Sequence, residues 1–295
     1  MKTYLTDFFK LFDYPQEAQN AFFHTYQAIQ VNSSARIRWS ALIDEYTANF
    51  NCDLKAQLNV CSELAKELCI SEFNIQLLLF ICHSKQLRVI FHENEIDDDI
   101  WFDTVAELKA KLFECYELYG IWGSFVASCF KPTFQLNGFV LGRLRFDPHP
   151  FGKTYEKNGI CLNEESIVIT THIPRTGEPL SPDACDKAFQ RAVKFFTSRL
   201  NLNPCVFTCS SWLLFPEHEK MLPATSNILA FSKRFELLDG GIHLDSSPNL
   251  WRIFDTLEQN PDRLPTDTSL RRAYVDYLRR GEKLGWGYGI YVPSF

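Results

Sequence analysis

The sequence lacks a hydrophobic run long enough to cross a membrane. Its longest apolar stretch, residues 75–82, is far short of the roughly 18 to 20 residues that a membrane-spanning helix needs. Residues 1–12 carry two lysines and an aspartate among their apolar side chains, which interrupts the continuous apolar segment of a secretory signal. These absences predict a chain that is neither exported nor inserted in a membrane.

Two other absences concern cysteine spacing and charge. Ten cysteines are present, but none forms a C-x-x-C pair, and many lie among apolar residues, as reduced buried thiols do. The formal net charge of -6 comes from mixed charges without a basic block, so the sequence does not favour nucleic acid or anionic lipid as a partner. We therefore expect a cytoplasmic protein that binds neither nucleic acid nor membranes.

Apolar and aromatic side chains, in contrast, are abundant. Of the 295 residues, 46% are hydrophobic and 15% are aromatic, which is ample for sizeable cores. The sequence contains no repeat of fixed period and no low-complexity tract. This composition predicts a globular protein of about two domains.

The first part of the chain has the periodicity of α-helices. Apolar residues recur at spacings of three and four in residues 104–119, and Asp103 is placed as an N-cap. The aspartates at 97–99 are interpreted as a solvated loop rather than a metal site, since no further carboxylate or histidine keeps ligand spacing with them. Predicted helices cover residues 15–30, 34–50, 54–68, 72–83 and 104–119. Residues 1–120 are therefore predicted to form an all-α domain.

From about residue 121 the pattern changes to β-rich segments that alternate with helices. Predicted strands cover residues 133–146, 166–173, 205–214, 235–238, 251–254 and 286–292. Predicted helices cover residues 182–200, 227–233 and 269–280, the last closed by Gly281. Strands that alternate with helices predict an α/β (α+β) layer architecture around a mixed sheet in residues 121–295.

The segment ITTHIPRTGEPLSPD, residues 169–183, connects a predicted strand to a helix start at which Ser181 fits the N-cap. Its loop 174–180 therefore precedes unpaired helix N–H groups, which favour an anion, and Gly177 lets the backbone approach a phosphate closely. A plain connector fits the same residues, because Asp183 already supplies negative charge to the helix dipole.

An ordered series of motifs runs through the second half of the chain. They are LGRLRF at 141–146, HIP at 172–174, CSSWLLFP at 209–216, LP at 222–223, SNI at 226–228, RF at 234–235, RIF at 252–254, LP at 264–265, TSLRRA at 268–273, and Gly285, Gly287 and Gly289. On these motifs the chain resembles the bacterial acyltransferase family that joins a helical N-acyltransferase N-terminal domain to a GNAT-like C-terminal domain. The resemblance spans both predicted domains. It implies an acyl-CoA-dependent N-acyltransferase with acetyl-CoA or another acyl-CoA as co-substrate and no metal.

The resemblance also implies where the acyl-CoA binds. The pyrophosphate is expected at the loop after a strand, and pantetheine between two strands that splay apart, here residues 166–173 and 205–214. The implied cofactor-binding residues are Ile173, Arg175, Thr176, Gly177, Leu180 and Ser181. The sequence departs from the family pattern where Ser210 replaces a histidine and Phe215 replaces an aspartate, and its loop RTGEPL is a shortened variant of the GNAT loop.

Direct transfer to an amine needs a base, N–H groups that hold the thioester carbonyl, and an acid for the departing thiolate. His172 is the candidate catalytic base, since it lies at a strand end and histidine is the side chain that ordinarily exchanges protons near neutral pH. A structural histidine bonded to the loop is the alternative. Ser226, Ser210 and Ser211 are candidate acids or water-holding groups, although Ser226 fits equally well as the N-cap of the helix that begins at Asn227.

The remaining candidates would contact the substrate. Arg143 and Arg145 alternate with apolar residues, so they share one strand face, where they could meet an acceptor carboxylate or a CoA phosphate. A solvated face or an interdomain ion pair is the alternative. Trp286 and its neighbouring glycines either line a cleft or belong to a bulged edge strand. The substrate-binding set is Arg143, Arg145, Ser211, Asn227 and Trp286. Cys209 is interpreted as a buried structural thiol rather than an acylated nucleophile.

Three functions are compatible with these observations. The leading hypothesis is an acyl-CoA-dependent N-acyltransferase, more specifically an acetyltransferase, that acts directly on a small amine-bearing substrate approaching between the two domains. The alternatives are a catalytically inactive GNAT-like protein that binds the ligand, and an interaction module whose function lies in the helical domain. The expected acceptor is a small molecule, and a homodimer is compatible with the sequence.

Overall fold

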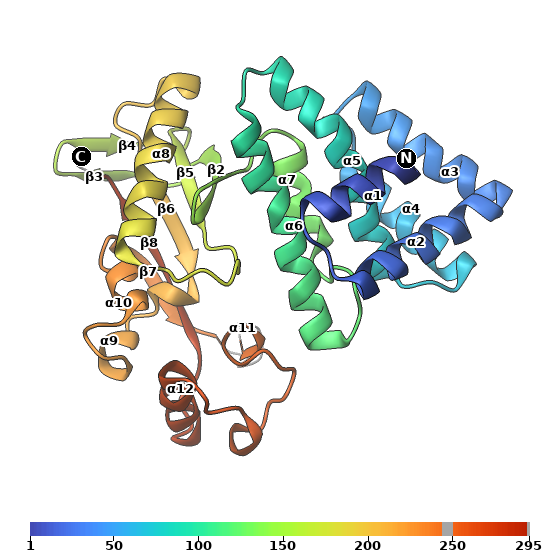
Figure 1. Ribbon diagram of the computed structural model, residues 1–295. Helices are drawn as coiled ribbons and strands as arrows, with labels where there is room; N and C mark the ends of the chain where they lie inside the picture. The colour runs from blue at the N-terminus through green and yellow to red at the C-terminus, as the bar shows by residue number, and fades with distance from the viewer. Residues whose placement is uncertain (244–249, 294–295) are drawn as a thin grey trace. The chain divides into compact units, whose positions relative to one another are not determined.

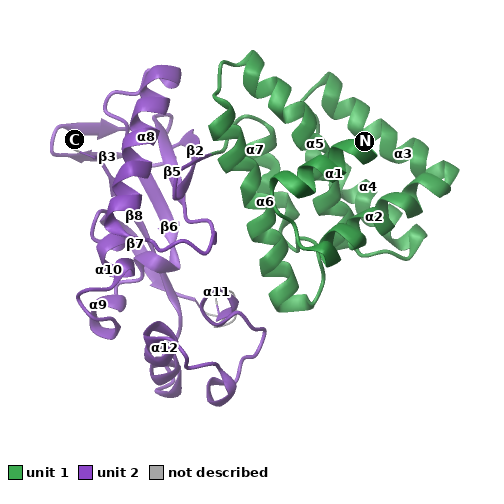
Figure 2. Cartoon of the chain, viewed as in Figure 1, with its two compact units in different colours: residues 1–139 green, residues 140–295 purple. Residues whose placement is uncertain are grey.

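The computed structural model describes residues 1–243 and 250–293. The chain forms two compact units, Met1–Phe139 and Val140–Phe295 (Figure 2). The change of sequence pattern near residue 120 precedes this division, because residues 127–134 form short helices that pack on the helical unit. The fold is a helical N-terminal part followed by a mixed-sheet part with flanking helices, which confirms the predicted fold class.

The first unit is built around one buried helix. Its elements are α1 Lys2–Leu11, α2 Gln16–Val31, α3 Ser33–Ala48, α4 Leu54–Leu68, α5 Glu72–Glu93, α6 Asp98–Tyr119, the 3-10 turn η1 Ala127–Phe130 and α7 Lys131–Phe134. Helix α5 contacts all the other helices of the unit named in Figure 1 and is buried without interruption over residues 77–84. The longest apolar run of the sequence is therefore the centre of a core. Across the described residues, no helix combines the length and apolarity that a membrane crossing requires.

Helix α6 begins earlier than its sequence pattern predicts. It starts at Asp98 rather than at residue 104, and Asp97 rather than Asp103 occupies the N-cap position. The three aspartates thus belong to a helix start, where negative charge is favourable, and not to a loop. Asp98 also forms an ion pair with Arg88 of α5, at 2.7 Å.

The second unit contains a six-stranded sheet in the order β1-β2-β5-β6-β8-β7. The strands are β1 Phe139–Leu141, β2 Leu144–Pro150, β5 Ile167–His172, β6 Phe207–Ser211, β7 Glu236–Ile242 and β8 Gly285–Tyr291, with a separate hairpin of β3 Tyr155–Lys157 and β4 Ile160–Leu162. The pair β5/β6 is parallel, whereas β2/β5, β6/β8 and β7/β8 are antiparallel. Helix α8, Pro182–Leu200, connects the two parallel strands, as such a pair requires.

Different layers cover the two faces of the sheet. Phe189 of α8 packs edge-on against Phe146, Phe207 and Tyr291, with ring centroids 4.9 to 5.6 Å apart. On the other face, residues of the β3–β4 hairpin pack against Val168. The remaining elements are η2 Trp212–Leu214, α9 His218–Met221, α10 Asn227–Ser232, α11 Leu250–Phe254, η3 Pro261–Arg263 and α12 Ser269–Arg279, and α11 and α12 contribute to a further apolar cluster.

Three predicted strands are wrong in whole or in part. Strand 205–214 ends at Ser211, because residues 212–214 form the 3-10 turn η2. Residues 251–254 form most of α11, whose apolar side chains pack with those of α12. Residues 131–134, at the start of the predicted strand 133–146, form α7, in which Pro132 occupies the first turn. The rest of that segment is divided into β1 and β2 by Gly142, whose φ of 76° lies in the left-handed region. Short apolar runs of this kind do not distinguish strand from helix by periodicity.

Candidate functional site

Strands β5 and β6 pair for only two residues and then separate (Figure 1). The parallel register joins residues 169–170 to residues 207–208, whereas β5 continues to His172 and β6 to Ser211. Each strand stays bonded to its outer neighbour, since β2 follows β5 to His172 and β8 follows β6 to Ser211. We call the separated ends, residues 171–172 and 209–211, the strand divergence. It is the arrangement that an acyl-CoA between two strands would require.

One backbone N–H is directed into the strand divergence. Ile169 N donates to Val206 O at 2.9 Å, so Val206 presents its backbone polar groups to β5. Alternate residues of a strand present these groups on the same side, which places Thr208 and Ser210 with Val206. Ser210 lies beyond the last paired residues. Its N–H is therefore directed into the strand divergence, where it could donate a hydrogen bond to a ligand carbonyl oxygen.

The loop 173–181 leads from the end of β5 to the start of α8. Ser181 Oγ accepts a hydrogen bond from Ala184 N at 3.3 Å, so Ser181 is the N-cap that the sequence predicts. Gly177 has a φ of +84°, and nothing lies within 4 Å of the position that a Cβ would occupy there. Thr176 and Gly177 are exposed, whereas Ile173 and Leu180 are half-buried. The middle of the loop therefore has room for a ligand.

Arg143 holds the backbone of this loop. Its side chain is buried, and it donates from Nε to Glu178 O at 3.1 Å and from Nη1 to Pro174 O at 2.8 Å. The structure thus places Arg143 beside the loop as an anchor for two carbonyl groups, and not on a solvated face. A buried guanidinium with two carbonyl partners fixes the loop conformation from both sides of Gly177.

Arg175, the candidate phosphate ligand, forms an ion pair within the second unit. Its Nη1 lies 2.8 Å from Oδ1 of Asp255, which follows α11. Asp255 also forms a close ion pair with Arg271 of α12, and Arg271 in turn pairs with Asp267 at 2.8 Å. Arg271 donates further to Ile253 O at 3.0 Å. Asp255, a residue that the sequence interpretation missed, is therefore shared by two arginines.

His172 lies at the end of β5 in contact with a buried carboxylate. His172 Nε2 is 3.0 Å from Oδ2 of Asp147, and the imidazole side chain is 45% exposed, against 13% for Asp147. Arg145 binds the same carboxylate through two hydrogen bonds, Nε to Oδ1 at 3.1 Å and Nη2 to Oδ2 at 2.9 Å. Burial alone would raise the pKa of Asp147, but the hydrogen bond from His172 and the charge of Arg145 hold it below its ordinary value. Asp147 is consequently ionised.

Register shows which candidates share a face of the sheet. Arg145 pairs with His172 across β2 and β5, Thr170 pairs with Thr208 across β5 and β6, and Ser210 pairs with Tyr288 across β6 and β8. Paired residues, and residues two apart on one strand, point to the same face. One face therefore carries Arg145, Asp147, His172, Ser210, Trp286 and Tyr288. Sequence reasoning named four of these six and missed Asp147 and Tyr288.

Tyr288 is the phenol of this face. Burial raises its pKa, although the neighbouring Thr208 side chain acts in the opposite direction, so the phenol stays protonated near neutrality. Lys153 Nζ lies 4.6 Å from the centroid of the Tyr288 ring. Tyr288 is thus a proton donor in the strand that borders the Ser210 side of the divergence.

The other sequence candidates mainly complete local structure. Ser226 Oγ accepts from Ile228 N at 3.2 Å and is the N-cap of α10, as the alternative interpretation had it, while Asn227 is exposed in the first turn. Ser211 Oγ accepts from Leu213 N at 3.2 Å and caps η2. Thr176 Oγ1 accepts from Glu178 N at 3.4 Å. None of these bonds joins its residue to His172.

The glycines of β8 are explained by packing against neighbouring segments. A Cβ on Gly285 would lie 2.0 Å from Phe215, and one on Gly287 would lie 2.3 Å from Leu214 O. Strand β8 lies between β6 and β7, so the edge-strand interpretation is wrong, and the register irregularity falls in β7. Phe215, where the family pattern has an aspartate, is a buried ring that needs this space.

Cys209 is buried on the face opposite His172, and burial raises the pKa of its thiol, so it is not a thiolate nucleophile. Nor do the described residues contain a group of three or more histidine, cysteine, aspartate or glutamate side chains that could hold a metal ion.

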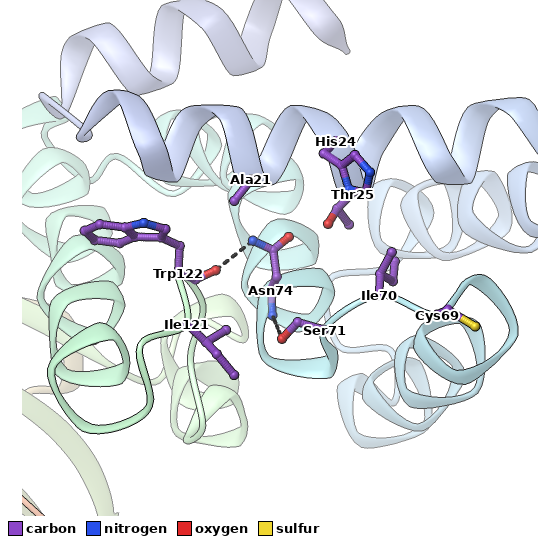
Figure 3. Close-up of a pocket in the computed structure, with 9 residues that line it drawn as sticks. All are labelled: Ala21, His24, Thr25, Cys69, Ile70, Ser71, Asn74, Ile121 and Trp122. Atoms are coloured by element: carbon purple, nitrogen blue, oxygen red, sulfur yellow. Dashed lines mark hydrogen bonds between the residues drawn. The ribbon is translucent and has the colours of Figure 1, made fainter.

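A separate cavity of about 320 Å³ lies in the first unit, at the start of α5 (Figure 3). Asn74 is at its centre, donates from Nδ2 to Trp122 O at 2.7 Å, and lies beside Ser71, the N-cap of α5. The lining residues are Ala21, His24, Thr25, Cys69, Ile70, Ser71, Asn74, Ile121 and Trp122. Because no lysine or arginine is among them, this cavity offers no fixed positive charge for a diphosphate.

A mixed sheet whose parallel strands separate beside a loop and a helix start is the architecture of a GNAT-like acyl-CoA domain. Residues 139–291 match the family model described as a GNAT-like C-terminal domain, and residues 3–130 match the one described as an N-acyltransferase N-terminal domain. The chain belongs to the acyltransferase family that combines these two domains. Among curated proteins, no sequence match to this chain is found.

Solved structures of acyltransferases share the fold. An acyltransferase in complex with decanoyl-CoA and teicoplanin is 19% identical, with a TM-score of 0.75 over 98% of this chain and 87% of that one. An acyltransferase mutant in complex with octanoyl-CoA is 20% identical, with the same TM-score and coverage. A further complex with decanoyl-CoA is 23% identical, with a TM-score of 0.63 over 74% of this chain and 66% of that one.

Proposed function

We propose that this protein is an acyl-CoA-dependent N-acyltransferase that transfers the acyl group directly to an amine. The strand divergence beside the loop 173–181 carries the proposal, because it combines a gap between paired strands with a helix start. The helix N–H groups and Arg175 would bind the pyrophosphate, and the divergence would hold the pantetheine and the thioester. The other proposed cofactor contacts are Ile173, Thr176, Gly177, Leu180 and Ser181.

The proposed chemistry uses the sheet face that carries His172. An acceptor amine with a pKa near 10 is almost fully protonated at neutral pH, so a base must remove its proton before attack. His172 is the proposed base. The amine nitrogen then bonds to the thioester carbon, the Ser210 N–H holds the carbonyl oxygen, and the carbon–sulfur bond breaks to release CoA thiolate. Tyr288 is the proposed acid for the thiolate and replaces Ser226, whose hydroxyl caps α10.

The donor and the acceptor are proposed more broadly than the sequence alone suggests. The structural relatives were solved with decanoyl-CoA, octanoyl-CoA and teicoplanin. These acyl chains are longer than an acetyl group, and teicoplanin is larger than a small amine. We therefore propose acyl-CoA donors from acetyl to decanoyl, and an acceptor amine on a molecule as large as a glycopeptide. Trp286 and Asn227 remain proposed acceptor contacts.

Calorimetric titration with CoA, acetyl-CoA, octanoyl-CoA and decanoyl-CoA tests the ligand, and thiol release with amines of increasing size then tests turnover. We expect Gly177→Asp to weaken CoA binding by about tenfold or more, because it places a negative charge beside the diphosphate. Gly177→Asn is the matched control, since asparagine has nearly the same shape, tolerates a positive φ and carries no charge. Equal CoA affinity in the two variants would contradict binding at this loop.

A non-enzymatic ligand-binding protein is the second candidate function. It is favoured by Ser210 and Phe215, which stand where the family pattern has histidine and aspartate, and by the internal ion pair of Arg175. CoA binding without thiol release from any donor would support it. Absence of CoA binding would leave the interaction module.

A further inference from the structure

The carboxylate of Asp147 is held rigidly between two elements of the chain. Both of its oxygens are engaged by Arg145 on the same strand, and Oδ2 is also engaged by His172 on the neighbouring strand. Register places Arg145 and His172 directly opposite each other, so the arrangement follows from the β2/β5 ladder and does not depend on a loop. A carboxylate with these partners cannot turn away from the imidazole without losing a charge-assisted hydrogen bond.

The contact with Asp147 uses one particular nitrogen of His172. Nε2 is the atom 3.0 Å from the carboxylate. An ionised carboxylate only accepts hydrogen bonds, so Nε2 must carry the proton, and the neutral ring then has its lone pair on Nδ1. The imidazole side chain is 45% exposed, so the ring is open to solvent. Other titratable groups of the same face are His149, bonded to Thr170 at 2.8 Å, and Tyr288 on β8. Farther along the sheet, Asp239 lies opposite Tyr288 and Glu236 opposite Ile290, and Lys153 pairs with Asp239 at 3.9 Å.

We propose that Asp147 is the positioning residue of the active site: through Nε2 it fixes the tautomer and the orientation of His172, so that Nδ1 takes the proton of the acceptor amine. This inference rests on the proposed acyl transfer and adds to it a residue that neither the sequence motifs nor the family resemblance indicated. Arg145 holds the Asp147 carboxylate in place through its two hydrogen bonds. Arg145 is therefore proposed as part of the base assembly rather than as a direct contact of substrate or CoA.

Replacement of the carboxylate by an amide tests the role of Asp147. In Asp147→Asn the amide can donate to Nε2, which would move the imidazole proton to Nδ1 and remove the basic lone pair from the acceptor side. We expect kcat to fall by about 10²- to 10⁴-fold, the range typical of a carboxylate that sets a histidine tautomer. The KM for acyl-CoA should stay within about twofold, because the loop 173–181 is untouched. The matched control is Asp262→Asn, whose carboxylate is 2.9 Å from the exposed Arg279 and should not affect the rate.

A measurement that needs no turnover separates the two proposals. Nitrogen-detected NMR of the histidine rings reports which nitrogen is protonated, and we expect His172 to be protonated at Nε2 in the parent and at Nδ1 in Asp147→Asn. An unchanged tautomer together with unchanged kcat overturns the inference. A purely structural role would lower the amount of folded protein without moving the tautomer, and that result also overturns it. If the parent shows no acyl transfer but the tautomer shifts, the proposed function fails while the coupling of Asp147 to His172 stands.

Discussion

Asp255 occupies an unusual position for a residue beside an anion site. Its carboxylate forms an ion pair with Arg175, the arginine that is proposed to bind a phosphate. The same carboxylate also forms an ion pair with Arg271. If a diphosphate bound to Arg175, Asp255 would keep Arg271 as its partner. The exchange of one anion for another at Arg175 therefore leaves no buried charge unpaired.

The consequence for affinity can be measured. In Asp255→Asn the competing carboxylate is removed, while Arg271 keeps Asp267 and Ile253 O as partners. We expect CoA to bind about three- to tenfold more tightly, as befits the loss of one partly exposed ion pair. Calorimetry with CoA is the measurement, and Asp262→Asn, which removes the carboxylate partner of the exposed Arg279, is the control. Weaker binding in Asp255→Asn would mean that the ion pair prepares the loop for the ligand rather than competing with it.

At the level of single residues, the sequence motifs identify most residues of the candidate site but not the carboxylate of Asp147. Arg143, Arg145, His172 and Ser210 lie in motifs of the family, so they could be named in advance. Asp147 follows the motif LGRLRF, and the alternation of a strand gives its face but not its partner. That partner, His172, is 25 positions away in the chain, and only the β2/β5 register brings the two together.

At the level of elements, the residues of β8 are determined by the segments that pack against this strand. Its extent is close to the prediction, residues 285–291 against 286–292, but its glycines are required for a reason that the sequence alone does not contain. Leu214 and Phe215 pack so closely on β8 that a methyl group at 285 or 287 would overlap them. Tertiary packing of the same kind makes residues 251–254 part of helix α11 where their apolar side chains predicted a strand.

The close packing predicts a position-dependent effect of alanine. Gly285→Ala should lower the free energy of unfolding by about 1 to 3 kcal/mol or more, because its Cβ would lie 2.0 Å from the buried Phe215 ring. Gly241→Ala, on the strand β7 that pairs with it, should change the stability much less, since the nearest atom, Trp286 Nε1, is 3.7 Å away. Urea denaturation followed by tryptophan fluorescence measures both. Equal midpoints for the two variants would contradict the packing explanation.

At the level of the whole molecule, each unit contains one buried neutral histidine. In the first unit, His83 stacks on Tyr46 at 4.2 Å and bonds Gln57 at 2.8 Å, and burial lowers its pKa to about 3. In the second unit, His218 bonds Tyr274, and burial lowers its pKa to about 4. The unfolded chain has histidine pKa values near 6.5, so below this pH the unfolded state binds protons that the folded state does not.

Acid should therefore destabilise both units separately. As the pH falls from about 6.5 towards 4, the free energy of unfolding should decrease by a few kcal/mol in total, and the decrease should end near the folded-state pKa values. Replacement His83→Gln should reduce the pH dependence of the first unit, and His218→Gln that of the second. Circular dichroism during acid titration is the measurement, and the exposed His24→Gln is the control. An acid transition that neither buried substitution moves would contradict this assignment.

The short β5/β6 pairing has a mechanical consequence for the sheet. Strands β1, β2 and β5 form one ribbon of neighbouring strands, and β6, β8 and β7 form another. Within the part of the chain that the structure describes, the register that joins the ribbons spans two residues on each strand, with one further bond from Ile169 N to Val206 O, while α8 provides the covalent link. A bound chain that hydrogen-bonds along both open edges would lengthen this seam, so occupancy would turn two loosely joined ribbons into one continuous and stiffer sheet.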